Sequence, residues 1–167
     1  MSNIETERLI LRPMTEADGE AVSQWTGDPA VNRYMPYPVH KNVEETKNWL
    51  RSLQGKEEEF GFCLKETGQL IGAGSIKYRE EFDAWEVGYN LRKDCWGKGY
   101  ATEAARALLQ WAYEHGARRF MARHATANAA SGNVLKKCGY QFSHLGQYSR
   151  YDGSETFDAT YYTMEME

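Results

Sequence analysis

The segment from Ala101 to His115 limits the fold of this chain more than any other feature. Its apolar residues recur every three or four positions, which predicts a helix with one buried face. These residues are Ala101, Ala104, Ala105, Leu108, Leu109 and Ala112. Gly116 follows at a position where helices commonly end. Strand-like runs lie on both sides of the helix, and a strand–helix–strand unit makes its two strands a parallel pair.

The other segments predict short strands in hairpin order, with two helices before the long one. Alternating hydrophobic residues indicate strands at 7–12, 60–64, 70–78, 83–92 and 118–124, and a hairpin within 140–167. Capping pairs predict where the first two helices begin, Thr15 with Asp18 and Asn42 with Glu45. A further short helix is expected at 131–138. We find no repeat or linker, so we expect one α/β (α+β) domain over residues 1–167.

Composition excludes several classes of protein. The 167 residues include 41% hydrophobic and 26% charged residues, as in ordinary globular proteins. A net charge of −4 argues against a nucleic-acid binder, which would carry a basic surplus. No membrane-spanning run or leader segment is visible. Cys63, Cys95 and Cys138 form no C-x-x-C pair, and the four histidines have no metal-ligand spacing. We therefore expect a cytoplasmic protein with no metal, membrane or nucleic-acid partner.

The loop before the long helix contains two glycines and reads Trp96-Gly97-Lys98-Gly99-Tyr100-Ala101-Thr102. Glycine lets backbone approach a ligand closely, and the free N–H groups at a helix N-terminus favour anions. These properties predict a phosphate-binding loop, with a tight turn that binds nothing as the alternative. Arg92 and Gly99 stand where a Walker A loop needs Gly and Ser or Thr, and Thr102 stands where a Rossmann fingerprint needs Gly or Ala. Both motifs are excluded.

Three segments together resemble the GNAT superfamily of N-acetyltransferases, and the resemblance covers nearly the whole chain. The family's pyrophosphate loop, Gln/Arg-x-x-Gly-x-Gly/Ala, is matched at Gly99 and Ala101, with Trp96 where Gln or Arg is usual. Three stretches look like the branch of ribosomal-protein N-terminal acetyltransferases: 96–105 (WGKGYATEAA), 5–13 (ETERLILRP) and 128–140. The resemblance implies the GNAT fold, with a mixed, mostly antiparallel central sheet, a splayed parallel pair and flanking helices.

The resemblance also implies acetyl-CoA as cosubstrate and assigns residues to its parts. The pantetheine arm should pair with the backbone of Tyr89, Asn90, Leu91 and Arg92, and the pyrophosphate should bind the amides of residues 97–102. Asn128 should contact the pantetheine. The alternative is that its side chain only caps the N-terminus of a helix. The nucleotide phosphates should lie near Asn133 and either Lys136 or Lys137. The alternative for both lysines is that they are solvated charges on the surface.

Acetylation of an amine needs a neutral nucleophile, and a lysine-like amine with a pKa of ~10.4 is almost wholly protonated at neutral pH. Glu86 corresponds to a position where several family members keep a catalytic glutamate, which implies a general base acting directly or through water. A surface glutamate on a strand is the alternative. Many family members have a tyrosine that protonates the leaving thiolate where this chain has Leu135. The source of that proton is therefore open.

The acceptor is expected to be a primary amine on a protein N-terminus or a small molecule. Its site should lie between the irregular segment 34–40 and the C-terminal hairpin. Tyr34, Met35 and Tyr37 are candidates for its wall, because two prolines keep this apolar segment rigid. Packing over the core is the alternative for all three.

Charge gives a weak indication of the acceptor's chemistry. Four carboxylates near the strand at 83–92 mildly favour a cationic amine: Glu80, Glu81, Asp83 and Glu86. A non-catalytic CoA-binding sensor or assembly domain of the same fold is the alternative function, although a pure binder has no need of a base at Glu86. The sequence does not decide the oligomeric state, and a homodimer stays open.

Overall fold

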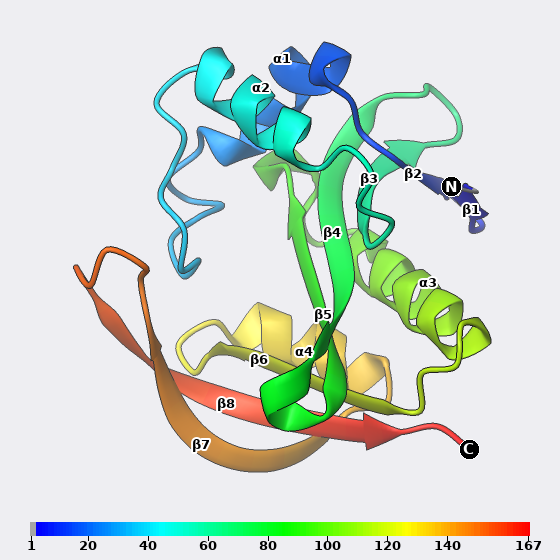
Figure 1. The fold of residues 1–167 in the computed structure, drawn as a ribbon, viewed down its shortest axis with the longest axis vertical. Coiled ribbons are helices and arrows are strands. Elements are labelled where there is room, and N and C mark those ends of the chain that lie inside the picture. Colours follow the sequence, from blue (N-terminus) through cyan, green and yellow to red (C-terminus); the bar gives the residue numbers. More distant parts are fainter. Residues whose placement is uncertain (1–2) are drawn as a thin grey trace.

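The sheet at the centre of the molecule has helices on both faces (Figure 1). Residues 3–167, which the computed structural model describes, form eight strands in the order β1-β2-β3-β4-β5-β6-β8-β7. The strands are β1 (Ile4–Glu5), β2 (Leu9–Arg12), β3 (Glu59–Leu64), β4 (Leu70–Arg79), β5 (Ala84–Leu91), β6 (Arg119–Ala125), β7 (Gln141–Ser149) and β8 (Thr156–Glu165). The α-helices are α1 (Gly19–Thr26), α2 (Val43–Ser52), α3 (Tyr100–Glu114) and α4 (Ala129–Lys137).

Helix α3 is the long helix that the sequence predicts, and it lies across one face of the sheet (Figure 1). The apolar positions of its stripe from Ala104 to Ala112 are all buried. They pack in one core with Phe60 and Phe62 from β3 and Phe120 from β6. Burying each large apolar side chain contributes about 1.5–3 kcal/mol before the entropy cost, so this contact fixes α3 against the strands.

The opposite face of β3 and β4 is covered by α1 and α2, which form a second core. Trp25 and Leu50 are fully buried there against β-strand residues such as Ala73. The predicted cap of α2 is confirmed, because the side chain of Asn42 accepts a hydrogen bond from the Glu45 N–H at 2.9 Å. This layer supports the irregular segment between the two helices.

Strands β5 and β6 are the predicted parallel pair, and all other neighbours in the sheet of residues 3–167 are antiparallel. They pair only at Trp85–Phe120 and Glu86–Met121. Beyond these two pairs the strands separate, as Figure 1 shows. The α3 loop follows the carboxyl end of β5, and α4 follows the carboxyl end of β6. Ligands of open α/β sheets bind at such a point.

The C-terminal hairpin of β7 and β8 is also confirmed. Strand β8 lies between β6 and β7, so β7 forms the edge of the sheet. The tip of the hairpin reaches the irregular segment between α1 and α2 (Figure 1). Within the described part of the chain, we find no helix with the length and apolar character needed to cross a lipid bilayer.

Candidate active site

The loop between β5 and α3 has the backbone that a close anion contact requires. Gly97 and Gly99 both adopt positive φ, +74° and +83°, which side chains other than glycine rarely tolerate. A Cβ at Gly97 would meet no atom within 4 Å, so the loop surface is open there. Gly99 is the N-cap of α3 and offers no side-chain cap, which leaves the first amides of the helix free for an anion.

Trp96 lies where most GNAT enzymes have Gln or Arg. Its indole Nε1 donates a hydrogen bond to the Leu91 carbonyl oxygen at 3.0 Å, and the ring is 45% exposed. Trp96 therefore ties the start of the loop to the end of β5 by a side-chain bond. Arg92 at the same strand end is bonded to Asp94 by its Nε at 2.5 Å and to the Cys95 sulfur by its Nη2 at 3.7 Å, so its guanidinium lies against the turn that precedes the loop.

The loop is also held from the N-terminal segment. Nη1 of Arg8 donates to the Lys98 carbonyl oxygen at 2.9 Å, and the Arg8 guanidinium lies 4.3 Å from the Tyr100 ring centroid. Glu103, in the first turn of α3, accepts hydrogen bonds from Arg8 and from the Thr6 hydroxyl. We did not assign these residues from the sequence, although they lie in two of the three stretches that carry the family resemblance, 5–13 and 96–105.

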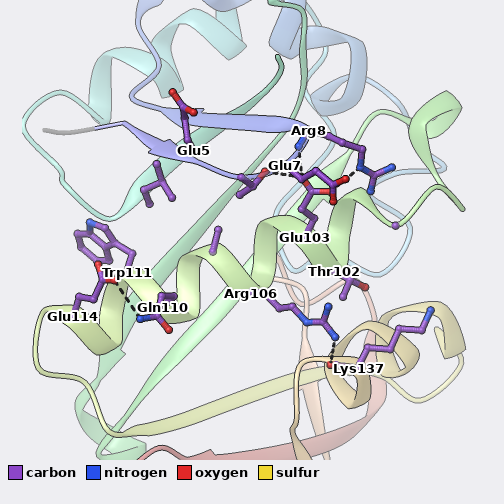
Figure 2. A pocket seen from close by; sticks show the side chains of 14 residues that line it. Glu5, Glu7, Arg8, Thr102, Glu103, Arg106, Gln110, Trp111, Glu114 and Lys137 are labelled. Carbon is purple, nitrogen blue, oxygen red and sulfur yellow. Dashed lines mark hydrogen bonds and ion pairs between the residues drawn. The ribbon is translucent and has the colours of Figure 1, made fainter. Parts of the chain in front are cut away.

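A pocket of about 780 Å³ runs along α3 from Gly99 to Glu114 (Figure 2). Its lining includes Gly99 and Thr102 from the predicted phosphate loop and Lys137 from α4. Arg106 projects from α3 towards α4, where its Nη2 donates to the Lys137 carbonyl oxygen at 2.7 Å. Of the two lysines that the sequence left open, Lys137 lines this pocket. Arg106 is a basic residue that sequence reasoning missed.

Helix α4 begins directly after Asn128, beside the diverging strands. The Asn128 side chain makes no capping hydrogen bond, so the capping alternative loses the contact that would support it. Asn133 and Lys136 are exposed on α4. Leu135 is buried in the core against α3 and β6, as a leucine at that position would be.

The side chains of Tyr89 and Asn90 point to opposite faces of β5. The Tyr89 hydroxyl lies 3.2 Å from the Ser131 hydroxyl of α4, on the α3 face. Burial raises the pKa of Tyr89 to about 12, so its hydroxyl stays protonated. On the other face, Asn90 Nδ2 donates to the Tyr37 hydroxyl oxygen at 2.6 Å. A predicted cofactor residue and a predicted acceptor residue are therefore in contact.

Glu86 belongs to the last parallel pair and shares the Asn90 face of β5. Arg79 Nη1 donates to its Oε1 at 2.5 Å. Its Oε2 lies 3.8 Å from Arg123 Nε, which is beyond hydrogen-bond distance. The side chain is 21% exposed. Glu86 is thus held by one oxygen, while the other makes no hydrogen bond within residues 3–167.

The segment around Tyr34, Met35 and Tyr37 is fixed mainly by contacts to its backbone. The Tyr148 hydroxyl donates to the Tyr34 carbonyl oxygen at 2.6 Å, and Arg150 Nη1 donates to that of Met35 at 3.2 Å. Both donors come from the β7–β8 hairpin and its turn. The expected neighbourhood of this segment and the hairpin is confirmed. From the sequence we did not single out Tyr148 and Arg150, the aromatic and basic residues of the hairpin that make these contacts.

The chain was compared with known proteins. A model of the GNAT acetyltransferase domain matches residues 8–141. The uncharacterized N-acetyltransferase YnaD of Bacillus subtilis (strain 168) is 31% identical over 165 residues, which cover 97% of this chain and 96% of YnaD. A GNAT-family acetyltransferase from Bacillus anthracis has a crystal structure that superposes with a TM-score of 0.88 at 30% identity, covering 98% of each chain.

A more distant structure is similar in fold alone. The ribosomal L7/L12 α-N-protein acetyltransferase RimL, solved in complex with coenzyme A, has 20% identity and a TM-score of 0.82, and the match covers 99% of this chain and 98% of RimL. The domain match spans most of the chain and includes the β5–α3 loop, both diverging strands and α4. The chain therefore belongs to the GNAT family of acetyltransferases.

Proposed function

We propose that this protein transfers the acetyl group of acetyl-CoA to a primary amine of a protein N-terminus or small molecule. One observation carries the proposal. β5 and β6 separate immediately after Glu86–Met121, and an open glycine loop with an uncapped helix N-terminus follows β5. The parting strands give backbone groups for an extended ligand arm, and the loop gives amides for its phosphates.

The residues present fit acetyl-CoA, which would supply the activated thioester. The backbone of residues 89–92 would pair with the pantetheine arm like an added strand, since β6 no longer pairs with it there. The amides of residues 97–102 would bind the pyrophosphate. Arg106 and Lys137 line the pocket next to Gly99 and would carry positive charge to the nucleotide phosphates. Asn128 and the exposed Asn133 and Lys136 complete the set from α4.

Glu86 would act as the general base. Arg79 fixes its Oε1, and Oε2 would accept the proton that the amine loses as it attacks. Side-chain amines need such a base more than N-terminal amines, because fewer of them are neutral at pH 7. Tyr37 lies at the same face through its bond to Asn90 and, with Tyr34 and Met35, would form the acceptor-side wall.

The test is a screen of turnover. Purified protein is incubated with acetyl-CoA and separate panels of peptides, amino acids, polyamines and aminoglycosides, and released thiol is measured beside the mass of the amine product. The proposal predicts thiol release that is stoichiometric with an acetylated amine in at least one panel. Tight binding of acetyl-CoA without transfer to any amine would instead support a non-catalytic sensor or assembly domain.

A further inference from the structure

Arg123 flanks the point where β5 and β6 separate. Along the two strands, Gly88 and Arg123 are each two residues beyond the last parallel pair, Glu86–Met121. Residues two apart on a strand share a face, so Arg123 lies on the face of Glu86 and Met121. Met121 packs there with Ala84, Ala159 and Tyr161, away from α3. Arg123 is therefore next to the proposed base, on the acceptor side of the sheet.

Two aromatic rings hold the Arg123 guanidinium. It lies 5.2 Å from the ring centroid of Tyr148 and 5.9 Å from that of Tyr161. Its Nη1 donates to the Tyr161 hydroxyl at 3.2 Å. A guanidinium has five N–H donors, and within residues 3–167 this is its one hydrogen bond. The side chain is 25% exposed, so the remaining donors are accessible to a ligand.

The other arginines of this region are already occupied. Arg79 is bonded to Glu81 and to Glu86. Arg150 is bonded to Glu155 and to two carbonyl oxygens of the segment that precedes Pro36. Arg123 differs from both because, apart from the bond to Tyr161, its donors make no hydrogen bond within residues 3–167, while its position is fixed.

The carboxylates that suggested a cationic acceptor do not form a negative site. Asp83 is paired with Arg119 at 3.0 Å, and Glu81 with Arg79 at 2.7 Å. Glu86 has Arg79 on one oxygen and Arg123 beside the other. Three of the four carboxylates are thus beside arginines, which weakens the indication of a polycationic acceptor. What the structure offers instead is one carboxylate and one guanidinium side by side.

We propose that Arg123 binds a carboxylate of the amine acceptor, which is therefore an amine that carries a carboxylate close by, as in an amino acid or an acidic peptide N-terminus. The inference rests on the proposed function. A zwitterionic acceptor matches the pair, since its ammonium would meet Glu86 while its carboxylate meets Arg123. Guanidinium binds carboxylate by two parallel hydrogen bonds, for which Arg123 has donors left. Tyr148 and Tyr161 keep its plane in position.

The experiment measures acetyl transfer to matched acceptors. One arm compares α-amino acids with their amides, and a second compares peptides that begin with Asp or Glu with those that begin with Asn or Gln. The arm with the larger difference identifies the source of the carboxylate. We expect kcat/KM to favour the carboxylate form by about 10- to 100-fold in that arm, the range for a hydrogen-bonded charged group.

Variants locate the effect. Arg123→Gln should raise the KM for the carboxylate form and reduce the preference to about twofold or less, with the amide form unchanged. Arg123→Lys should give an intermediate preference, because it keeps the charge but loses the paired donors. Arg119→Gln is the matched control on the same face of β6, and it should keep the wild-type preference.

Three results would overturn the inference: equal or better use of amides or polyamines by the wild type, an unchanged preference in Arg123→Gln, or equal loss in Arg119→Gln. If Arg123→Gln does not fold, the inference is still tested by the carboxylate preference of the wild type and by the reduced preference expected of Arg123→Lys. Absence of transfer to every amine overturns the proposed function instead. Arg123 is then judged by whether amino acids, but not their amides, raise the Tm of the wild type.

Discussion

Glu103 and Arg8 are joined by two hydrogen bonds across 95 positions of sequence. Glu103 Oε2 accepts from the Arg8 backbone N–H at 2.8 Å, and its Oε1 accepts from Arg8 Nε at 2.7 Å. The Thr6 hydroxyl also donates to Oε2, at 2.5 Å. One carboxylate in the first turn of α3 thereby connects the N-terminal segment to the helix that follows the phosphate loop.

The first prediction concerns the stability that this carboxylate provides. Burial alone would raise the pKa of Glu103, but the hydrogen bonds from Thr6 and Arg8 outweigh it and lower the pKa below 4.5. The unfolded chain therefore binds more protons in acid, and the contribution is present above pH 4.5 and lost as pH falls through the folded-state pKa. Glu103→Gln should cost about 2 kcal/mol of unfolding free energy at pH 7.

Denaturant unfolding at several pH values measures this. The gap between wild type and Glu103→Gln should narrow as pH falls below 4.5. Glu114→Gln, in the last turn of the same helix, should show little loss at any pH, because Glu114 is exposed. A gap that stays constant with pH would mean that Glu103 acts by packing and not by its charge.

The second prediction concerns the Tyr37 hydroxyl. Tyr37→Phe removes the bond from Asn90 and should raise the KM for the acceptor several-fold while the Kd for acetyl-CoA stays within about twofold. Tyr78→Phe is the matched control, since it deletes a hydroxyl bonded at 2.7 Å to Asp83 outside the proposed site. Steady-state kinetics with both substrates varied measures this. Unchanged kinetics in Tyr37→Phe would leave the residue with a packing role.

The features that could be predicted from the sequence are those that depend on residues close together in the chain. The apolar stripe of α3, the cap at Asn42 and the alternation of the strands each involve residues a few positions apart, and all three are confirmed. The parallel β5–β6 pair was also predicted, because a strand–helix–strand connection leaves few other arrangements.

The contacts that shape the candidate site are not local, and this is why the sequence did not reveal them. Arg150 meets Met35 across 115 positions, and Arg123 meets Tyr161 across 38. An arginine on a strand looks the same whether it is paired, as Arg79 is, or has donors to spare, as Arg123 has. Likewise, four carboxylates near one strand suggested a negative site, and only the fold places arginines beside three of them.

The third prediction concerns Glu86. Glu86→Gln should lower kcat by about 100-fold or more and leave acetyl-CoA affinity nearly unchanged, because the carboxylate acts on the amine. For an amine of high pKa, the loss should shrink as pH rises, since more of the amine is neutral without help. A pH–rate profile for an acceptor that the turnover screen identifies measures this.

Glu81→Gln is the control for this variant. It also removes a carboxylate bonded to Arg79, but Glu81 is exposed and lies away from the diverging strands, so kcat should be unchanged. An equal loss in Glu86→Gln at all pH values would assign the residue to orienting Arg79, Arg123 or the acceptor.

The most direct test of the account compares two glycines that have nearly the same φ angle but lie in different loops. Gly97 has φ +74° in the phosphate loop, Gly68 has φ +76° in the β3–β4 turn, and a Cβ at either meets nothing within 4 Å. Gly97→Val and Gly68→Val should therefore lose similar stability, about 1–2 kcal/mol each.

Their response to acetyl-CoA should differ, and the measurement is the rise in Tm on adding saturating acetyl-CoA. The account predicts that wild type and Gly68→Val are stabilised alike, whereas Gly97→Val, whose side chain stands where the pyrophosphate would lie, shows little or no rise. An equal rise in both variants would contradict the account, because acetyl-CoA would then bind elsewhere than at the loop between β5 and α3.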